Sequence, residues 1–219
     1  MKDTLLTKKH KSQIVSEIAK KDYGFAVRIL DSISTRHAGT AKMKDKRYVI
    51  KEIVLSINEN HDSSKEKEFF EAGKKILALK SNNAKEIGIH ILWRAYSYNK
   101  KAVEDYLYKI TDDYNWEVRE YAAGALAETL RYDPGFYSTL KKWSRDKSEN
   151  IRRGVVLAAV GLRDRKDPTT LNKAFALLEP LLYDSSVYVK KNLGPFILGS
   201  YFGNAFPKEM FQLIGEMVK

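Results

Sequence analysis

"DYNWEVREYAAGAL" (residues 113–126), "DKSENIRRGVVLAAVGL" (146–162) and "DSSVYVKKNLGPFILG" (184–199) share one pattern: an aspartate, four residues, a β-branched apolar residue and then arginine or lysine. The apolar position, which is Val118, Ile151 and then Val189, recurs after 33 and 38 residues. Within each stretch the apolar residues have helical spacing. A helical stretch that recurs at this period is typical of helical-repeat proteins.

A second kind of helix is predicted between these stretches, in "AVEDYLYKI" (102–110), "GFYSTLKKW" (135–143) and "LNKAFALLEPLL" (171–182). Each repeat is then a helix pair of roughly 35 to 40 residues, the size of HEAT or armadillo repeats. We therefore expect an all-α fold, an α-solenoid of HEAT-like repeats in a single domain over residues 1–219. Its clearest repeats lie at 84–207 and its less regular helices at 1–60. The basic segment 34–47, poor in large apolar residues, predicts a mobile loop.

The charge balance indicates an anionic partner. The 219 residues include 39 Lys and Arg against 28 Asp and Glu, a net charge of +11 and a pI near 9.5. Nucleic acid is the first candidate and an acidic membrane surface the second, while a basic protein without a polyanionic partner stays an alternative. In a solenoid, the basic residues of successive repeats would form a stripe on a concave surface.

Several site classes are disfavoured by composition. The absence of cysteine excludes thiol catalysis and cysteine-ligated zinc, and the four histidines lack metal-ligand spacing. No apolar run is long enough for a membrane span, and the start "MKDTLLTKKHK" lacks the apolar core of a signal peptide. We expect an intracellular protein that uses no metal.

The basic residues of the three repeats are candidate phosphate ligands: Arg119, Arg152, Arg153, Lys190 and Lys191. A stripe of such residues matches a phosphate backbone, which is bound through charge and shape. In the alternative interpretation, turn aspartates bond to the basic residue of a following helix in a neighbouring repeat, so that Asp113, Arg152, Asp146 and Lys190 are structural. The second basic residue, at 153 or 191, is then the better candidate to face a ligand.

Trp116 and Glu120 are the candidate catalytic pair. Their spacing of four places them on one helix face, one turn apart and away from the apolar stripe. A carboxylate beside an aromatic face stabilises a positive centre, which suits cleavage of a glycosidic bond through an oxocarbenium-like state. In the alternative interpretation both residues are structural: Trp116 is a packing residue and Glu120 is a surface ion-pair partner.

Residues 84–207 resemble the HEAT-like DNA alkylation repair family, the AlkD and AlkC alkylpurine glycosylases of bacteria. The resemblance is carried by "NWEVREYAAGAL", "ENIRRGVVLAAV" and "DSSVYVKKNLGPFILGSYFGNAFP". In AlkD-type enzymes a tryptophan and, four residues later, an aspartate contact the damaged nucleotide. Trp116 matches this tryptophan, and Glu120 replaces the aspartate with one more methylene. Where the family has a second aromatic residue this chain has Pro195, with Tyr188 and Phe196 as the alternative lining of the lesion site.

The resemblance implies a DNA glycosylase that hydrolyses the N-glycosidic bond of N3- or N7-alkylated purines in duplex DNA. Glu120 would stabilise the deoxyribose cation, Trp116 would pack against the sugar, and Arg153, Lys190 and Lys191 would hold phosphates. The implied enzyme needs no metal or organic cofactor, binds no membrane, and acts as a monomer in the bacterial cytoplasm at the nucleoid. Two other functions stay open: a non-catalytic binder of bent or branched DNA, and a protein-interaction solenoid.

Overall fold

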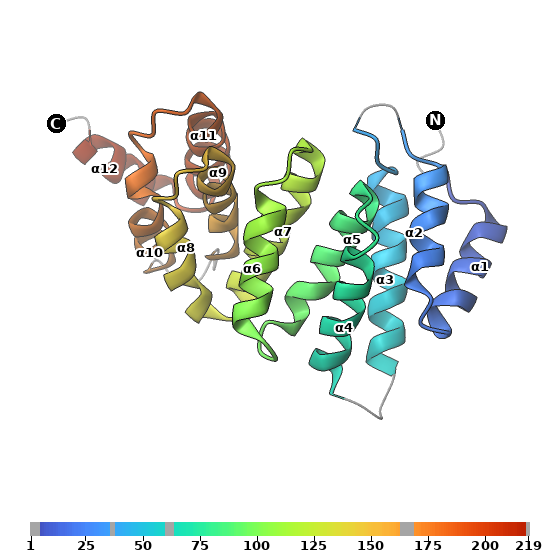
Figure 1. Cartoon of the computed structure of the whole chain (residues 1–219). Helices are drawn as coiled ribbons and strands as arrows, with labels where there is room; N and C mark the ends of the chain where they lie inside the picture. The colour runs from blue at the N-terminus through green and yellow to red at the C-terminus, as the bar shows by residue number, and fades with distance from the viewer. Residues whose placement is uncertain (1–4, 36–37, 60–63, 163–168, 218–219) are drawn as a thin grey trace. The chain divides into compact units, whose positions relative to one another are not determined.

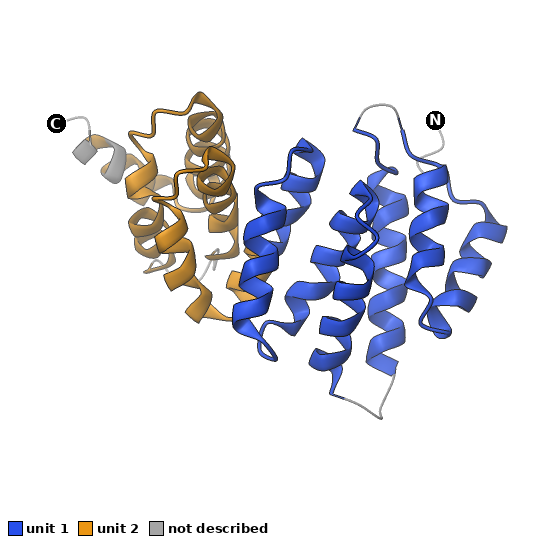
Figure 2. Ribbon diagram, viewed as in Figure 1, with its two compact units in different colours: residues 1–125 blue, residues 126–219 orange. Residues whose placement is uncertain are grey.

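The computed structural model describes residues 5–35, 38–59, 64–162 and 169–217 (Figure 1). These residues form twelve α-helices and short helical turns, and none of them lies in a strand, which confirms the all-α prediction. The chain divides into two compact units, residues 1–125 and 126–219, with the border inside helix α7 (Trp116–Tyr132) (Figure 2). The single domain, the continuous solenoid and its concave basic surface stay predictions.

Unit 1 is built of antiparallel helices in which α3 packs against α1 and α5, and α4 packs against α5 (Figure 1). Helix α3 buries Val49, Ile53 and Ile57, spaced by one turn, so that one stripe of the helix faces the core. The helices are α1 (Lys8–Ala19), α2 (Tyr23–Ser32), α3 (Met43–Glu59), α4 (Lys65–Leu77), α5 (Asn82–Leu92), the 3₁₀ turn η1 (Trp93–Ala95), α6 (Lys100–Thr111) and the first part of α7.

Two glycines allow α4 and α5 to approach closely. A Cβ atom on Gly73 would lie 2.8 Å from Cβ of Leu92, and one on Gly88 would lie 2.7 Å from Cγ of Leu77. Any larger residue would therefore push the two helices apart. This contact fixes the end of α5 and the following turn, which supply one wall of the site described below.

Unit 2 contains the rest of α7 and the C-terminal elements. Its π-helix runs through Pro195, whose missing N–H interrupts regular α-helical bonding, and Ser200 Oγ donates to the Pro195 carbonyl at 3.0 Å. The elements are η2 (Pro134–Phe136), α8 (Tyr137–Trp143), α9 (Glu149–Ala158), η3 (Ala159–Leu162), α10 (Thr169–Leu178), η4 (Glu179–Leu181), α11 (Val187–Asn192), the π-helix η5 (Leu193–Gly203) and α12 (Pro207–Met217). In the part of the chain that is described, no helix is both long and apolar enough to cross a bilayer.

The repeated aspartate is a turn residue. In each repeat its Oδ1 atom accepts the backbone N–H two residues later, which turns the chain into the next helix. The repeated β-branched position that follows is fully buried each time. The three turns are Asp113 to Asn115 at 2.9 Å, Asp146 to Ser148 at 2.8 Å and Asp184 to Ser186 at 2.8 Å.

The predicted loop at 34–47 is wrong over its last five residues, because α3 begins at Met43. Thr40 and Ala41 before it are buried, and Lys46 within its first turns is fully buried. Composition misled the prediction because Lys46 enters the protein interior together with carboxylates from distant parts of the sequence. Residues 36 and 37 of this segment lie outside the described residues.

Candidate functional site

The first turn of α7 presents the candidate catalytic pair. The side-chain oxygen of Asn115 accepts the backbone N–H of Glu117 at 2.9 Å and so caps the helix, while its amide donates to the Ala38 carbonyl at 2.8 Å. Trp116 is 44% exposed, and Glu120 one turn later is exposed as well. Both side chains therefore stand on the surface of unit 1, on a helix end that the cap holds in place.

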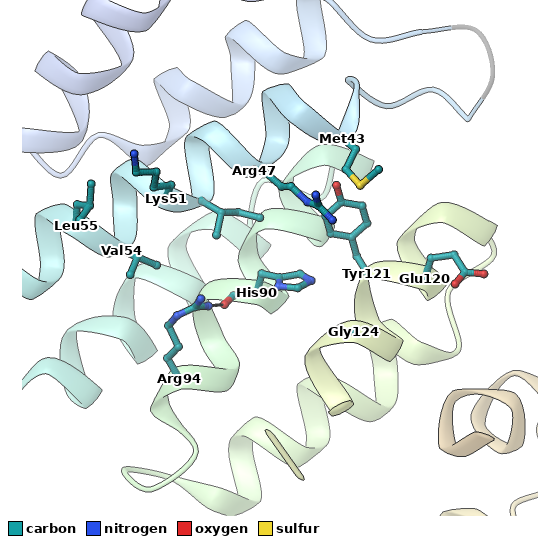
Figure 3. Close-up of a pocket in the computed structure, with 11 residues that line it drawn as sticks. Met43, Arg47, Lys51, Val54, Leu55, His90, Arg94, Glu120, Tyr121 and Gly124 are labelled. Atoms are coloured by element: carbon teal, nitrogen blue, oxygen red, sulfur yellow. Dashed lines mark hydrogen bonds between the residues drawn. The ribbon is translucent and has the colours of Figure 1, made fainter. Parts of the chain in front are cut away.

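A cavity of about 590 Å³ lies beside Glu120 in unit 1. In Figure 3 the ring of Tyr121 lies toward Arg47 and His90, whereas the Glu120 carboxylate points away from these residues at the edge of the cavity. Helix α3, the end of α5 with the following turn, and α7 supply the walls. The lining residues are Met43, Arg47, Ile50, Lys51, Val54, Leu55, His90, Arg94, Glu120, Tyr121 and Gly124.

Three cations line this cavity. Arg47 and Lys51 lie one turn apart on α3, are exposed, and form no hydrogen bond or ion pair with another described residue. The Arg94 guanidinium donates to the His90 carbonyl (Figure 3). It also lies 4.6 Å from the centre of the Trp93 ring. The cavity therefore carries positive charge, with Glu120 at its edge as the single acidic lining residue.

Beneath the cavity, Lys46 on α3 forms ion pairs with residues on α5 and α7 and so connects three helices. Its Nζ atom lies 2.5 Å from Glu86 Oε2 on α5 and 2.8 Å from Glu117 Oε1 on α7. The other oxygen of Glu117 accepts from the Thr40 hydroxyl at 2.5 Å, and the ring of Tyr121 lies 4.4 Å from the Lys46 ammonium. These contacts fix the first turns of α7, from which Trp116 and Glu120 extend.

Burial shifts the titration of two groups in this network. It raises the pKa of Glu86 to about 7, and the attraction of Lys46 offsets only part of the effect. Burial also raises the pKa of Tyr121, and the nearby charges of Glu86 and Glu117 add to the shift. Tyr121 is therefore a neutral phenol at physiological pH, and its ring meets that of His90 edge to face at 5.3 Å.

In two of the three repeats, the first basic residue has structural contacts. Arg119 donates to the carbonyls of Asp113 at 2.8 Å and of the next residue at 3.0 Å. Arg152 makes the same two contacts with its own turn and also binds Asp184 in bidentate fashion, at 2.6 and 3.0 Å. Hydrogen bonding to Arg152 lowers the pKa of Asp184. The Arg152–Asp184 pair is the kind of contact that the structural interpretation predicts.

The remaining basic residues, which are the second of the middle repeat and both of the last repeat, differ from each other. Arg153 is only 5% exposed, with its guanidinium 4.7 Å from the centre of the Tyr188 ring, whereas Lys190 and Lys191 are exposed on α11. On η5, Pro195 is exposed and the Phe196 side chain is 48% exposed. All of these residues belong to unit 2, whereas Trp116, Arg119 and Glu120 belong to unit 1. A shared DNA site of the two groups, and the phosphate contacts, stay predictions.

Among the lining residues, sequence reasoning missed all five that carry a basic or aromatic side chain: Arg47, Lys51, His90, Arg94 and Tyr121. The only signal was the spacing of four in two basic pairs, which many solvated helix faces share. These pairs face one cavity only because α3 packs against α5, and no short-range sequence pattern reveals that packing. Within the described ranges, no group of three or more acidic or histidine side chains is placed to bind a metal ion.

A comparison with protein-family models matches residues 41–198 to the DNA alkylation repair enzyme family. A search of curated proteins finds no match. The matched region begins just before α3, covers well over half of the chain, and includes every residue that lines the cavity as well as all the predicted site residues. The chain belongs to the DNA alkylation repair enzyme family.

Proposed function

We propose that the protein is a DNA glycosylase that hydrolyses the N-glycosidic bond of N3- or N7-alkylated purines in duplex DNA. The observation that carries the proposal is an exposed carboxylate, Glu120, one turn after the exposed Trp116 and at the edge of a cationic cavity. Family membership supports a role in DNA repair. The three cations of the cavity wall fit a substrate that carries phosphates.

The chemistry demands little of the protein because the alkylated base is already cationic. When the bond between C1′ and the base nitrogen breaks, its electron pair leaves with the base, which becomes neutral. The positive charge that develops on the deoxyribose is stabilised by the Glu120 carboxylate and by the face of Trp116. A water molecule oriented by the same carboxylate adds to C1′ and gives up a proton.

The glutamate carries one more methylene than the aspartate of AlkD-type enzymes, and this affects the expected rate. Displacement of a catalytic group by about one bond length can cost ~100-fold in rate. Figure 3 shows the Glu120 carboxylate extended away from the cavity. We therefore propose a slow enzyme whose rate rises in the Glu120→Asp variant.

The test is single-turnover release of 7-methylguanine and 3-methyladenine from methylated duplex DNA. Glu120→Gln and Trp116→Ala should each lower release, by about 100-fold for the loss of a charge-stabilising group. Glu128→Gln is the matched control, because Glu128 lies two turns further along α7 and pairs with Arg131. Release that persists unchanged in Glu120→Gln would refute the catalytic assignment.

The second candidate function is a non-catalytic protein that binds distorted or branched DNA. Pro195 favours it, because this exposed proline stands where the resembling enzymes have an aromatic lesion contact. No base release by the natural protein, together with salt-sensitive DNA binding, would support this function over the glycosylase. Negligible DNA binding would instead support a protein-interaction role.

A further inference from the structure

The cavity in unit 1 has an apolar wall that lies open to solvent. Met43 is 51% exposed and Leu55 is 41% exposed, and Ile50 and Val54 line the cavity between them on the same helix. Exposed apolar side chains gathered in a concave site indicate a bound ligand with an apolar face. Tyr121 adds an aromatic ring, which Lys46 and His90 hold in place from below and from the edge.

The cations of the cavity stand beside this apolar wall. Arg47 and Lys51 extend from α3 without an ion-pair or hydrogen-bond partner among the described residues, and contacts to its neighbours hold Arg94 in position. By contrast, Arg119 and Arg152 already bind turn carbonyls inside the protein. The cavity thus brings Arg47 and Lys51, which have no such partner among the described residues, beside an apolar surface. A ligand that fits it combines an anion with a flat apolar ring.

We propose that this cavity binds a single unpaired nucleotide of a DNA strand. Its phosphate lies on Arg47, Lys51 and Arg94, and its base lies against the apolar wall of α3 and Tyr121. The cavity volume of about 590 Å³ falls within the roughly 300 to 1,000 Å³ of small-molecule sites. A base inside intact duplex is stacked on both faces and cannot reach such a wall, whereas an unpaired base exposes them.

The inference rests on the proposed function only in taking DNA as the substrate, and it needs no catalysis by Glu120. An unpaired nucleotide arises opposite an excised base, at a bulge, or where a lesion weakens pairing. The cavity would therefore favour DNA that has lost local pairing over a fully paired duplex of the same sequence. A phosphate with a base also occurs in a free mononucleotide. The experiment must therefore separate binding of an unpaired nucleotide within a DNA strand from binding of a free mononucleotide.

The experiment compares two duplexes without alkylated bases, one fully paired and one with a single 2-aminopurine bulge. Fluorescence anisotropy measures affinity, and 2-aminopurine emission reports the surroundings of the unpaired base. We expect the bulged duplex to bind about 10-fold more tightly, the gain typical of one stacked base. Arg47→Ala and Lys51→Ala should remove this preference, and Met43→Ser should weaken it while leaving binding of the paired duplex unchanged.

Lys75→Ala is the matched control, because Lys75 is an exposed cation on α4 outside the cavity. It should lower the affinity for both duplexes equally and leave the preference intact. Equal binding of the two duplexes by the natural protein would overturn the inference, as would a preference that survives Arg47→Ala. Deoxyadenosine monophosphate is the second probe: if it binds without any preference for the bulge, the source is a free nucleotide and the inference is also overturned.

Neither duplex contains an alkylated base, so the result does not depend on glycosylase activity. A protein that prefers the bulge and releases no methylated base would keep this inference and lose the proposed function. A protein that releases methylated bases and binds both duplexes equally would keep the proposed function and lose this inference. Circular dichroism of each variant checks that it is folded.

Discussion

Glu86 should make the protein less stable as the pH rises from acid to neutral. Its side chain is fully buried, its carboxylate lies 2.5 Å from Lys46 Nζ, and its pKa is raised from 4.5 to about 7. Between these two values the folded protein holds a proton that the unfolded chain releases. The free energy of unfolding is therefore highest below about pH 4.5, falls as the pH rises to about 7, and is constant for this group above that.

The size of the effect follows from the same shift. One pKa unit corresponds to about 1.4 kcal/mol, so a shift from 4.5 to about 7 removes about 3 kcal/mol of stability across this range. This loss is a large fraction of the free energy of unfolding of an ordinary domain, which is roughly 5 to 15 kcal/mol. Glu86→Gln keeps the shape of the protonated side chain and cannot ionise. We expect it to exceed the natural protein in stability by less than about 1 kcal/mol near pH 5 and by about 3 kcal/mol at pH 8.

Urea unfolding followed by tryptophan fluorescence at pH 5, 6, 7 and 8 measures this difference. Trp93 and Trp116 report on unit 1, while Trp143 reports on unit 2, so separate transitions of the units would be visible. Glu71→Gln, an exposed position on α4, controls for the general loss of a charge. A difference between Glu86→Gln and the natural protein that stays the same from pH 5 to pH 8 would refute the reasoning.

Three further substitutions test contacts seen in the structure. Lys46→Met leaves two carboxylates without their buried cation and should cost about 3 to 5 kcal/mol in urea unfolding, and an unchanged free energy of unfolding would contradict this role. Gly161→Ala drives a methyl group into a carbonyl oxygen of α7 and should cost about 1 to 3 kcal/mol, whereas Gly215→Ala in α12, which meets no atom within 4 Å, should not lower the melting temperature. Arg152→Ala breaks the bidentate pair with Asp184 and should cost about 3 kcal/mol at pH 7. Because this pair lowers the pKa of Asp184, the deficit should shrink as the pH falls through that pKa, and a deficit equal at pH 7 and pH 3 would contradict the assignment.

The repeats were predictable from sequence because their signals are local. An aspartate that caps a turn, a buried β-branched residue five positions after that aspartate, and a basic residue next to it act within one helix start. The same pattern also predicted Trp116 and Glu120 as exposed neighbours on α7, away from the buried stripe of Val118.

The cavity and the buried network were not predictable, because their residues are distant in sequence. From sequence alone, Lys46 looks like one more cation in a basic loop. Only the folded structure shows that it pairs with Glu86 on α5 and Glu117 on α7. Arg153, which the sequence favours to face a ligand, is only 5% exposed and lies against Tyr188, so that its phosphate contact stays a prediction. Net charge thus predicted a class of partner, and tertiary packing decided which cations face solvent.

The buried lysine also bears on how the chain folds as it is synthesised. Lys46 leaves the ribosome well before Glu86, and Glu117 follows 71 residues after Lys46. Until Glu117 has emerged, burial of the Lys46 ammonium with Glu86 as its single carboxylate partner costs free energy. The side of α3 that carries Lys46 is therefore expected to stay in contact with water. The N-terminal helices should therefore wait for the start of α7 and then close together, so that translation past residue 117 sets the earliest moment at which unit 1 reaches its final packing.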